Sequence, residues 1–240
     1  MKVGRIGAGL CVAAVGAIVA RLAMVSDLQP KPSTEEPAEA PARPAPKPLD
    51  PGPEPTVKLN AHSAQIAARA RSLLDRPNRA FRDDCSGYVS SVYTAADIEM
   101  DGTVAEIYAI AEDAGLLHHH PIPTIGDLVF FDNTHDRNGN GKWDDTRTHI
   151  GVVVDVDPAG TARIAHRGSR YAILEMNLMH PMTQKDEAGE TINSHLRRYA
   201  ASDTWSLYLA SQMWTAFASI HPEVDWVGPS GKIKRGLPVP

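Results

Sequence analysis

The spacing of apolar residues changes part-way along the chain. Over the first half of the folded region, apolar residues recur every three or four positions, which is the helical period. This spacing predicts helices over residues 60–74, 85–98 and 104–114. From Gly126 onward, short apolar runs rich in β-branched residues replace it. These runs predict strands over residues 127–131, 149–156, 161–166 and 171–176.

Helical spacing returns near the C-terminus, where Asp203 is the expected N-cap of a helix that reaches Phe217. Helices followed by consecutive strands predict an α+β domain rather than a series of βαβ units. We expect this domain to cover residues 57–222 and residues 223–240 to form an irregular tail.

The first 25 residues are typical of an export signal. Lys2 and Arg5 precede an unbroken apolar run over residues 6–20. The run is shorter than the ~20 residues that span a bilayer, but with residues 22–25 it is long enough for an uncleaved anchor in the inner membrane. Residues 1–25 therefore fit both a cleaved signal and a retained anchor. Either predicts an exported protein of the periplasm or cell envelope.

Residues 26–56 are rich in proline, with ten prolines between positions 27 and 56. Such a segment favours polyproline II and cannot bury enough apolar surface to fold, so we expect a disordered linker. Without residues 1–25, the chain has 21 basic and 29 acidic residues, a formal charge of −8. This balance argues against a nucleic-acid partner, which requires a basic surface.

Cys85 lies in the predicted domain, whereas the other cysteine, Cys11, lies in the N-terminal apolar run. A lone cysteine accompanied by histidines is a candidate nucleophile. Asp83 and Asp84 are suited to cap a helix that begins at Cys85. A helix N-terminus lowers the pKa of a thiol, whereas the two carboxylates oppose this effect. The alternative is a buried cysteine that acts as a small hydrophobic residue.

Residues 84–89, Asp-Cys-Ser-Gly-Tyr-Val, resemble the nucleophile motif of the NlpC-type cell-wall peptidases, relatives of the CHAP amidases and distantly of papain. A second stretch strengthens the resemblance, because Gly126-Asp127 precedes one predicted strand and His149 begins the next. The resemblance extends over about residues 60–170. It implies a papain-like domain with N-terminal helices packed on an antiparallel sheet.

The same resemblance implies roles for individual residues. Cys85 would attack an amide carbonyl, His149 would act as the base, and His166 would orient the base. Asp84 and Ser86 fall where family members contact the stem peptide of peptidoglycan. No cofactor is implied for catalysis.

The strand register tests the role of His166 independently of the family. Residues 157–160, Asp-Pro-Ala-Gly, have the composition of a turn. With a loop of these four residues, His166 faces Gly151 and shares a face of the sheet with His149. Such diagonal neighbours are about 7–8 Å apart, which a hydrogen bond between the rings can span. The alternative is that His166 is an ordinary polar strand residue.

Residues 136–145 contain oxygen ligands at the spacing of a calcium-binding loop. The candidate ligands are Asp136, Asn138, Asn140, the carbonyl of Lys142, Asp144 and Asp145. Arg147 replaces the glutamate that closes an EF-hand loop. We expect a structural Ca²⁺ here, with an ion-free Asn/Gly-rich turn as the alternative.

Three adjacent histidines, His118, His119 and His120, precede Pro121. Adjacent rings in a loop diverge, so we expect a solvated turn rather than a metal site. One cysteine and two histidines elsewhere lack the fourth ligand of a structural zinc site.

These features predict an exported cysteine hydrolase, an endopeptidase or amidase that cleaves amide bonds in the stem peptides of bacterial peptidoglycan. Two other classes remain open. One is an inactive wall-binding module that keeps the fold, and the intact Cys85, His149 and His166 count against it. The other is a calcium-stabilised structural or adhesion domain in which Cys85 is incidental.

Overall fold

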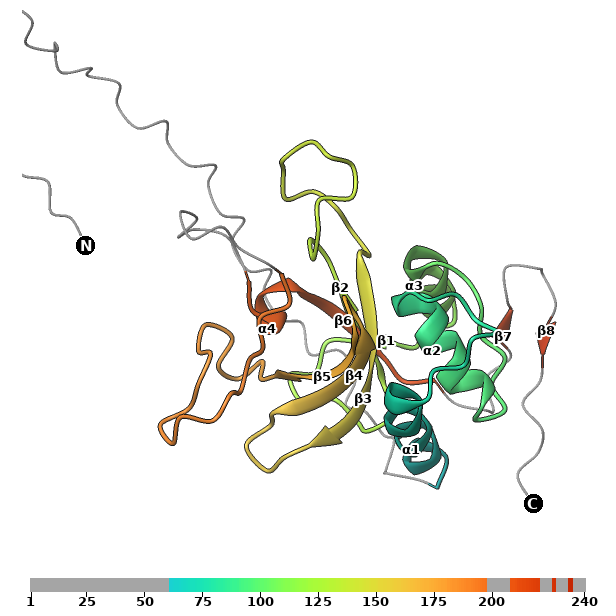
Figure 1. Ribbon diagram of the computed structural model, residues 1–240, viewed down its shortest axis with the longest axis horizontal. Helices are drawn as coiled ribbons and strands as arrows, with labels where there is room; N and C mark the ends of the chain where they lie inside the picture. Colours follow the sequence, from blue (N-terminus) through green and yellow to red (C-terminus); the bar gives the residue numbers. More distant parts are fainter. Residues whose placement is uncertain (1–60, 198–207, 221–225, 228–232, 235–240) are drawn as a thin grey trace, which may run out of the picture. The chain divides into compact units, whose positions relative to one another are not determined.

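The computed structural model describes residues 61–197, 208–220, 226–227 and 233–234 of the 240-residue chain (Figure 1). The chain divides into two units, Met1–Pro44 and Ala45–Pro240, and the described residues all belong to the second. The expected signal or anchor, the linker and the cap at Asp203 lie outside the described residues. Within the described ranges, no helix is both long and apolar enough to cross a membrane.

Three helices precede the main strands, at positions close to those that the apolar spacing predicts. They are α1 (Ala61–Asp75), α2 (Cys85–Thr94) and α3 (Val104–Asp113). The prediction extended the second helix to residue 98, whereas α2 ends at Thr94. The chain leaves the helix where Asp97 adopts a left-handed φ of +64°, and the Ile98 N–H bonds back to the Tyr93 carbonyl at 2.9 Å.

Local signals define both ends of α3. At its start, Thr103 Oγ1 accepts a hydrogen bond from the Glu106 N–H, and the Glu106 carboxylate accepts one from the Thr103 N–H. This reciprocal capping box satisfies two backbone N–H groups that the helix leaves free. At its end, Gly115 takes a φ of +68°, as a glycine that terminates a helix commonly does.

A six-stranded antiparallel sheet has the order β1-β6-β2-β3-β4-β5. Its strands are β1 (Leu117–His118), β2 (Leu128–Phe131), β3 (His149–Val156), β4 (Ala162–Arg167), β5 (Tyr171–Met176) and β6 (Trp214–Ala218). This arrangement confirms an α+β domain, and α1, α2 and α3 lie on one side of the sheet (Figure 1). Where the sequence predicts an irregular tail, β7 (Trp226–Val227) and β8 (Ile233–Lys234) form a two-stranded ladder.

The helix predicted over residues 203–217 is wrong in the described part of that range. Ala210–Met213 forms a single helical turn, α4, and β6 then enters the sheet between β1 and β2. Both faces of β6 are covered, because Ala216 packs in one cluster of apolar side chains and Phe217 in another. A strand buried on both faces is apolar at successive positions, so its spacing does not distinguish it from a helix.

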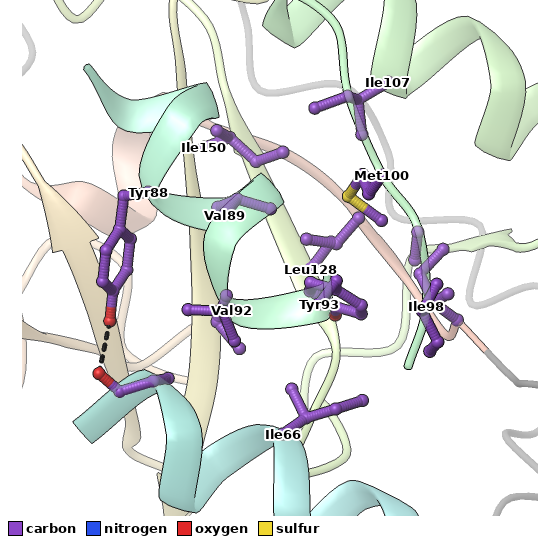
Figure 2. Close-up of a cluster of buried hydrophobic side chains, with 14 of the residues drawn as sticks. Ile66, Tyr88, Val89, Val92, Tyr93, Ile98, Met100, Ile107, Leu128 and Ile150 are labelled. Carbon is purple, nitrogen blue, oxygen red and sulfur yellow. Dashed lines mark hydrogen bonds between the residues drawn. The ribbon is translucent and has the colours of Figure 1, made fainter. Parts of the chain in front are cut away.

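The helix that carries Cys85 lies in the middle of one of these two clusters (Figure 2). Every residue of α2 from 86 to 93 is buried. The Tyr88 hydroxyl donates a 2.7 Å hydrogen bond to the Ala70 carbonyl of α1, drawn as a dashed line in Figure 2. α2 therefore has little freedom to move relative to α1 and β3, so the backbone that carries Cys85 is held rigidly.

The solvated turn predicted at residues 118–120 is wrong. His118 lies in β1 and is 6% exposed, and His120 is also buried. His118 Nε2 lies 3.1 Å from Oδ2 of the buried Asp127, whose Oδ1 accepts from the Ser219 hydroxyl at 2.8 Å. These contacts join β1 to the start of β2 and the end of β6. Within the described residues, no group of three or more His, Cys, Asp or Glu side chains is arranged to hold a metal ion.

Candidate active site

Cys85 is the first residue of α2, as the sequence predicts. Asp84 is the N-cap, and its Oδ1 accepts from the Gly87 N–H at 2.7 Å and from the Ser86 hydroxyl at 2.9 Å. Position 87 requires glycine, because a Cβ there would lie 2.1 Å from the Arg82 carbonyl oxygen. The local sequence therefore places the sulfur at the N-terminal end of a buried helix.

The environment of the thiol differs from the prediction. Burial and the neighbouring Asp84 carboxylate raise the pKa of Cys85 above its ordinary value. Hydrogen bonds from the backbone N–H groups of Ile150, Ser86 and Cys85 itself act in the opposite direction but are weaker. The N–H groups of the helix start thus lower the thiol pKa as expected, but burial and Asp84 outweigh them, so the net shift is upward. At neutral pH the resting group is a thiol, and its reaction requires a base.

Two histidines that line the same cavity as this thiol form a pair on adjacent strands. His149 begins β3, immediately before Ile150, whose backbone N–H acts to lower the pKa of the thiol. His149 Nε2 lies 2.9 Å from Nδ1 of His166, which is on β4. The two rings are perpendicular, with centroids 5.1 Å apart. The hydrogen bond between the rings that the strand register predicts is therefore present.

The register itself arises differently from the prediction. His166 pairs with Gly151, as predicted. At the turn, however, Val156 pairs with Ala162, one residue later than a loop of residues 157–160 implies. An irregularity between Val153 and Asp155 shifts the register back by one residue. The two offsets cancel, and both histidines remain on one face.

Both histidines are neutral at physiological pH. Burial, followed by electrostatic interaction with His166 and His135, lowers the pKa of His149 to about 3. Burial lowers the pKa of His166 to about 4. His149 is therefore unprotonated and able to accept a proton over a wide pH range, but a ring with so low a pKa is a weak base.

The direction of the hydrogen bond decides whether His149 can act as that base. A neutral imidazole carries one proton, on one of its two nitrogens. When His149 Nε2–H donates to His166 Nδ1, the lone pair of His149 Nδ1 is free to take a proton. In the opposite direction, His149 would carry its proton on Nδ1. Base catalysis by His149 therefore requires His166 to be the acceptor.

A cavity of about 1160 Å³ is lined by Cys85, His149, His166 and Asp84. Four of the five side chains predicted for the site thus surround one space, which is large enough for a peptide segment. Ser86 is the exception, because it is buried and is not among the lining residues. Its hydroxyl bonds to Asp84 and accepts from Arg82 Nη2 at 3.0 Å, so it supports the helix start.

Several other groups on the cavity walls have no signal in the sequence. They come from three segments that meet only in the folded chain: His135 after β2, Arg170 after β4, and His195 and Arg197 beyond β5. The Arg197 guanidinium is fixed, since it lies 3.8 Å from the ring centroid of Trp143. Spacing along the sequence could not indicate that these side chains face one cavity.

The candidate calcium loop connects β2 to β3, and Asp136 also lines the cavity. The side-chain amides of Asn138 and Asn140 donate to the Asp144 carboxylate at 3.0–3.2 Å. These bonds lower the pKa of Asp144, and the bond from Asn140 has the larger effect. The Lys142 N–H donates to Asn140 Oδ1 at 2.8 Å. Three of the six predicted ligands, Asn138, Asn140 and Asp144, are therefore in contact, through the asparagine amide nitrogens.

Asp145 has a different role from the other candidate ligands. It is 2% exposed, and its Oδ2 accepts from the Arg137 N–H at 3.0 Å. The Asp145 N–H donates to Asn133 Oδ1, and the Asp145 carbonyl accepts from the Asn133 N–H. Asp145 therefore closes the base of the loop.

No family model matches the chain, and no curated protein matches its sequence. Among solved structures, the fold is similar to a protein from Staphylococcus aureus subsp. aureus Mu50 described as similar to lipoprotein, NLP/P60 family. The two chains are 19% identical, with a TM-score of 0.37. The match covers 70% of this chain and 45% of the other, so this chain spans less than half the length of that structure. A likeness at this level does not assign the chain to a family.

Proposed function

We propose that the chain is an exported cysteine peptidase or amidase of the NlpC/CHAP type, which hydrolyses amide bonds in peptidoglycan stem peptides in the cell envelope. One observation carries the proposal: Cys85 shares a cavity with His149 and His166, whose rings are hydrogen-bonded at 2.9 Å. A nucleophile, a base and a group that orients the base are the parts that cysteine-dependent acyl transfer requires. The motif at residues 84–89 supports wall peptides as the substrate.

In this reaction, His149 Nδ1 accepts the thiol proton of Cys85 and the sulfur attacks the amide carbonyl. Backbone N–H groups at the start of α2 stabilise the developing oxyanion. His149, held through Nε2 by His166, then gives its proton to the leaving amine. The amine departs and leaves a thioester, which water hydrolyses with His149 again as the base.

Digestion of purified peptidoglycan tests the proposal. Incubation with the purified chain should release soluble fragments, and mass spectrometry should identify one cleaved amide bond. The position of the new amino group distinguishes an endopeptidase, which cuts between amino acids, from an amidase, which separates the peptide from the sugar. A sample alkylated with iodoacetamide is the control and should release none. Intact peptidoglycan after incubation with the untreated chain would contradict the proposed function.

His166→Gln should keep activity that His166→Ala loses. Gln Oε1 can accept the proton of His149 Nε2–H, whereas alanine leaves His149 free to adopt the unproductive tautomer. We expect kcat for His166→Ala to fall by about 10- to 100-fold and His166→Gln to recover part of the loss. The measurement is kcat for both variants on the same peptide. Equal activity of the two variants would remove His166 from the orienting role.

The proposal includes a structural Ca²⁺ in the loop of residues 136–145. Carboxylate and amide oxygens are the ligands that this ion prefers, and Asp136, Asn138, Asn140 and Asp144 supply them from one loop. Because the two asparagine amides already gather at Asp144, rotation of each amide would turn its oxygen towards the same space. The ion would hold the loop that leads into His149 and would take no part in bond cleavage.

Calcium should raise the melting temperature of the chain, because an ion that binds only the folded state stabilises it by mass action. At a concentration of 100 Kd the effect is about 2.7 kcal/mol. Asp136→Ala should abolish this shift. Asp186→Ala is the control, since Asp186 also accepts bonds from backbone N–H groups in an exposed turn but lies outside the loop. Identical melting curves in EDTA and in excess Ca²⁺ would establish an ion-free turn.

A further inference from the structure

Three side chains connect the segment before α2 to β4 and β5. Arg167 Nε and Nη2 donate to the two carboxylate oxygens of Asp83 at 2.9 and 3.1 Å. The Tyr171 hydroxyl donates to Asp83 Oδ1 at 2.8 Å. Arg167 also donates through Nη1 to the Gly168 carbonyl, so each nitrogen of the guanidinium has an acceptor. We name Asp83, Arg167 and Tyr171 the Asp83 clamp.

The clamp lies where the two halves of the candidate site meet. Asp83 is two residues before Cys85, and Arg167 directly follows His166. Asp83 and Arg167 line the cavity. Tyr171 adds a contact to α2 itself, because its ring packs edge-on against Tyr88 with centroids 5.6 Å apart. The clamp therefore joins the start of the nucleophile helix to the strand that carries the orienting histidine.

The clamp has one exposed and one largely buried partner, because the Asp83 side chain is 71% exposed and that of Arg167 is 18% exposed. Solvent screens an ion pair with an exposed partner, so stability alone does not account for this arrangement. A bidentate guanidinium–carboxylate pair instead fixes the relative orientation of its two partners. The hydrogen bonds from Arg167 and then Tyr171 lower the pKa of Asp83 to about 2, so the pair remains charged at neutral pH.

We propose that the Asp83 clamp sets the position of the Cys85 thiol relative to the His149–His166 pair. Asp83, Arg167 and Tyr171 are then positioning residues for the hydrolysis, and this inference rests on the proposed function. A misplacement of about 1 Å can cost a catalytic site about 10²-fold in rate. The contribution of the clamp should therefore appear in kcat far more than in stability.

Two arginines on β4 provide a matched pair of variants. Arg167→Gln breaks the clamp. Arg163→Gln breaks another arginine–aspartate pair on the same strand, a single contact of 2.7 Å between Arg163 Nη1 and Asp155 Oδ2, and neither residue lines the cavity. Tyr171→Phe removes one hydrogen bond from the clamp and keeps the ring that packs on Tyr88. The measurements are kcat, KM, melting temperature and the rate of Cys85 alkylation by iodoacetamide.

We expect Arg167→Gln to lower kcat by about 10- to 100-fold, with KM and melting temperature close to those of Arg163→Gln. Tyr171→Phe should give a smaller loss in the same direction, and Arg163→Gln none. Cys85 should be alkylated faster in Arg167→Gln than in Arg163→Gln, because the partly buried thiol loses its fixed position. Equal kcat in the two arginine variants would overturn the proposal. A loss of kcat that accompanies an equally large loss of folded protein would also overturn it.

The alkylation rate separates this inference from the proposed function. If the wild-type chain releases nothing from peptidoglycan, the proposed function fails, but the thiol can still be alkylated. Faster alkylation of Arg167→Gln than of Arg163→Gln would then still support the clamp as the element that positions Cys85. Equal rates would overturn it whatever the substrate.

Discussion

Cys85→Ala is expected to release no fragments from peptidoglycan and to melt at nearly the wild-type temperature. The substitution removes the sulfur that attacks the carbonyl, and no other group in the proposed mechanism can form the thioester. Loss of the nucleophile from a comparable catalytic set costs on the order of 10⁶-fold in kcat. Stability should change little, because the sulfur lines a cavity and its loss leaves no closed void. The measurements are fragment release and thermal melting of the same preparation.

Ser90→Ala is the matched control for this variant. Ser90 lies on the same helix and also loses one heavy atom, but it does not line the cavity. Its Oγ is buried without a hydrogen-bond partner, so alanine removes a polar atom that gains nothing from burial. Ser90→Ala should therefore keep full activity and at least the wild-type melting temperature. Wall degradation by Cys85→Ala would rule out the cysteine mechanism.

The sequence predicts best those elements whose apolar residues lie on one face or whose ends carry local signals. α1 and α3 follow their helical spacing, and β3 and β5 begin and end where the prediction places them. The prediction failed for β6, because a strand covered on both faces lacks alternation. It also failed for β1, since two residues are too few to show any period.

The candidate site shows the same division between local and tertiary information. The N-cap at Asp84 and the position of Cys85 depend on neighbouring residues, and both are predictable. The direction in which the thiol pKa shifts depends on the burial of Cys85, which the spacing of residues around it does not reveal. The clamp joins Asp83 to two residues that lie 84 and 88 positions further along the sequence, so no short motif contains all three. The pairing of His166 with Gly151 was predicted correctly, because the one-residue shift at the turn and the one-residue irregularity in the ladder, neither of which was predicted, cancel.

His149→Ala should lower kcat/KM by about 10²- to 10⁴-fold, the usual contribution of a general base. The wild-type pH profile should also identify this residue. Because the pKa of His149 is lowered to about 3, the base loses its lone pair only as the pH falls towards that value. The acid limb of kcat/KM should therefore lie near pH 3–4 rather than near the ordinary histidine pKa of 6.5. Measurement of kcat/KM between pH 3 and 8 checks this expectation.

His135→Ala is the control for the charge effect on His149. Electrostatic interaction with His135 helps to lower the pKa of His149, so its removal should move the acid limb to slightly higher pH and leave kcat largely intact. The thiol provides a second test. With Cys85 and His149 both neutral at rest, the apparent pKa for alkylation should lie above the ordinary cysteine value, in His149→Ala as in the wild type. A wild-type alkylation pKa below 7 that disappears in His149→Ala would show instead that the resting enzyme holds a thiolate–imidazolium pair.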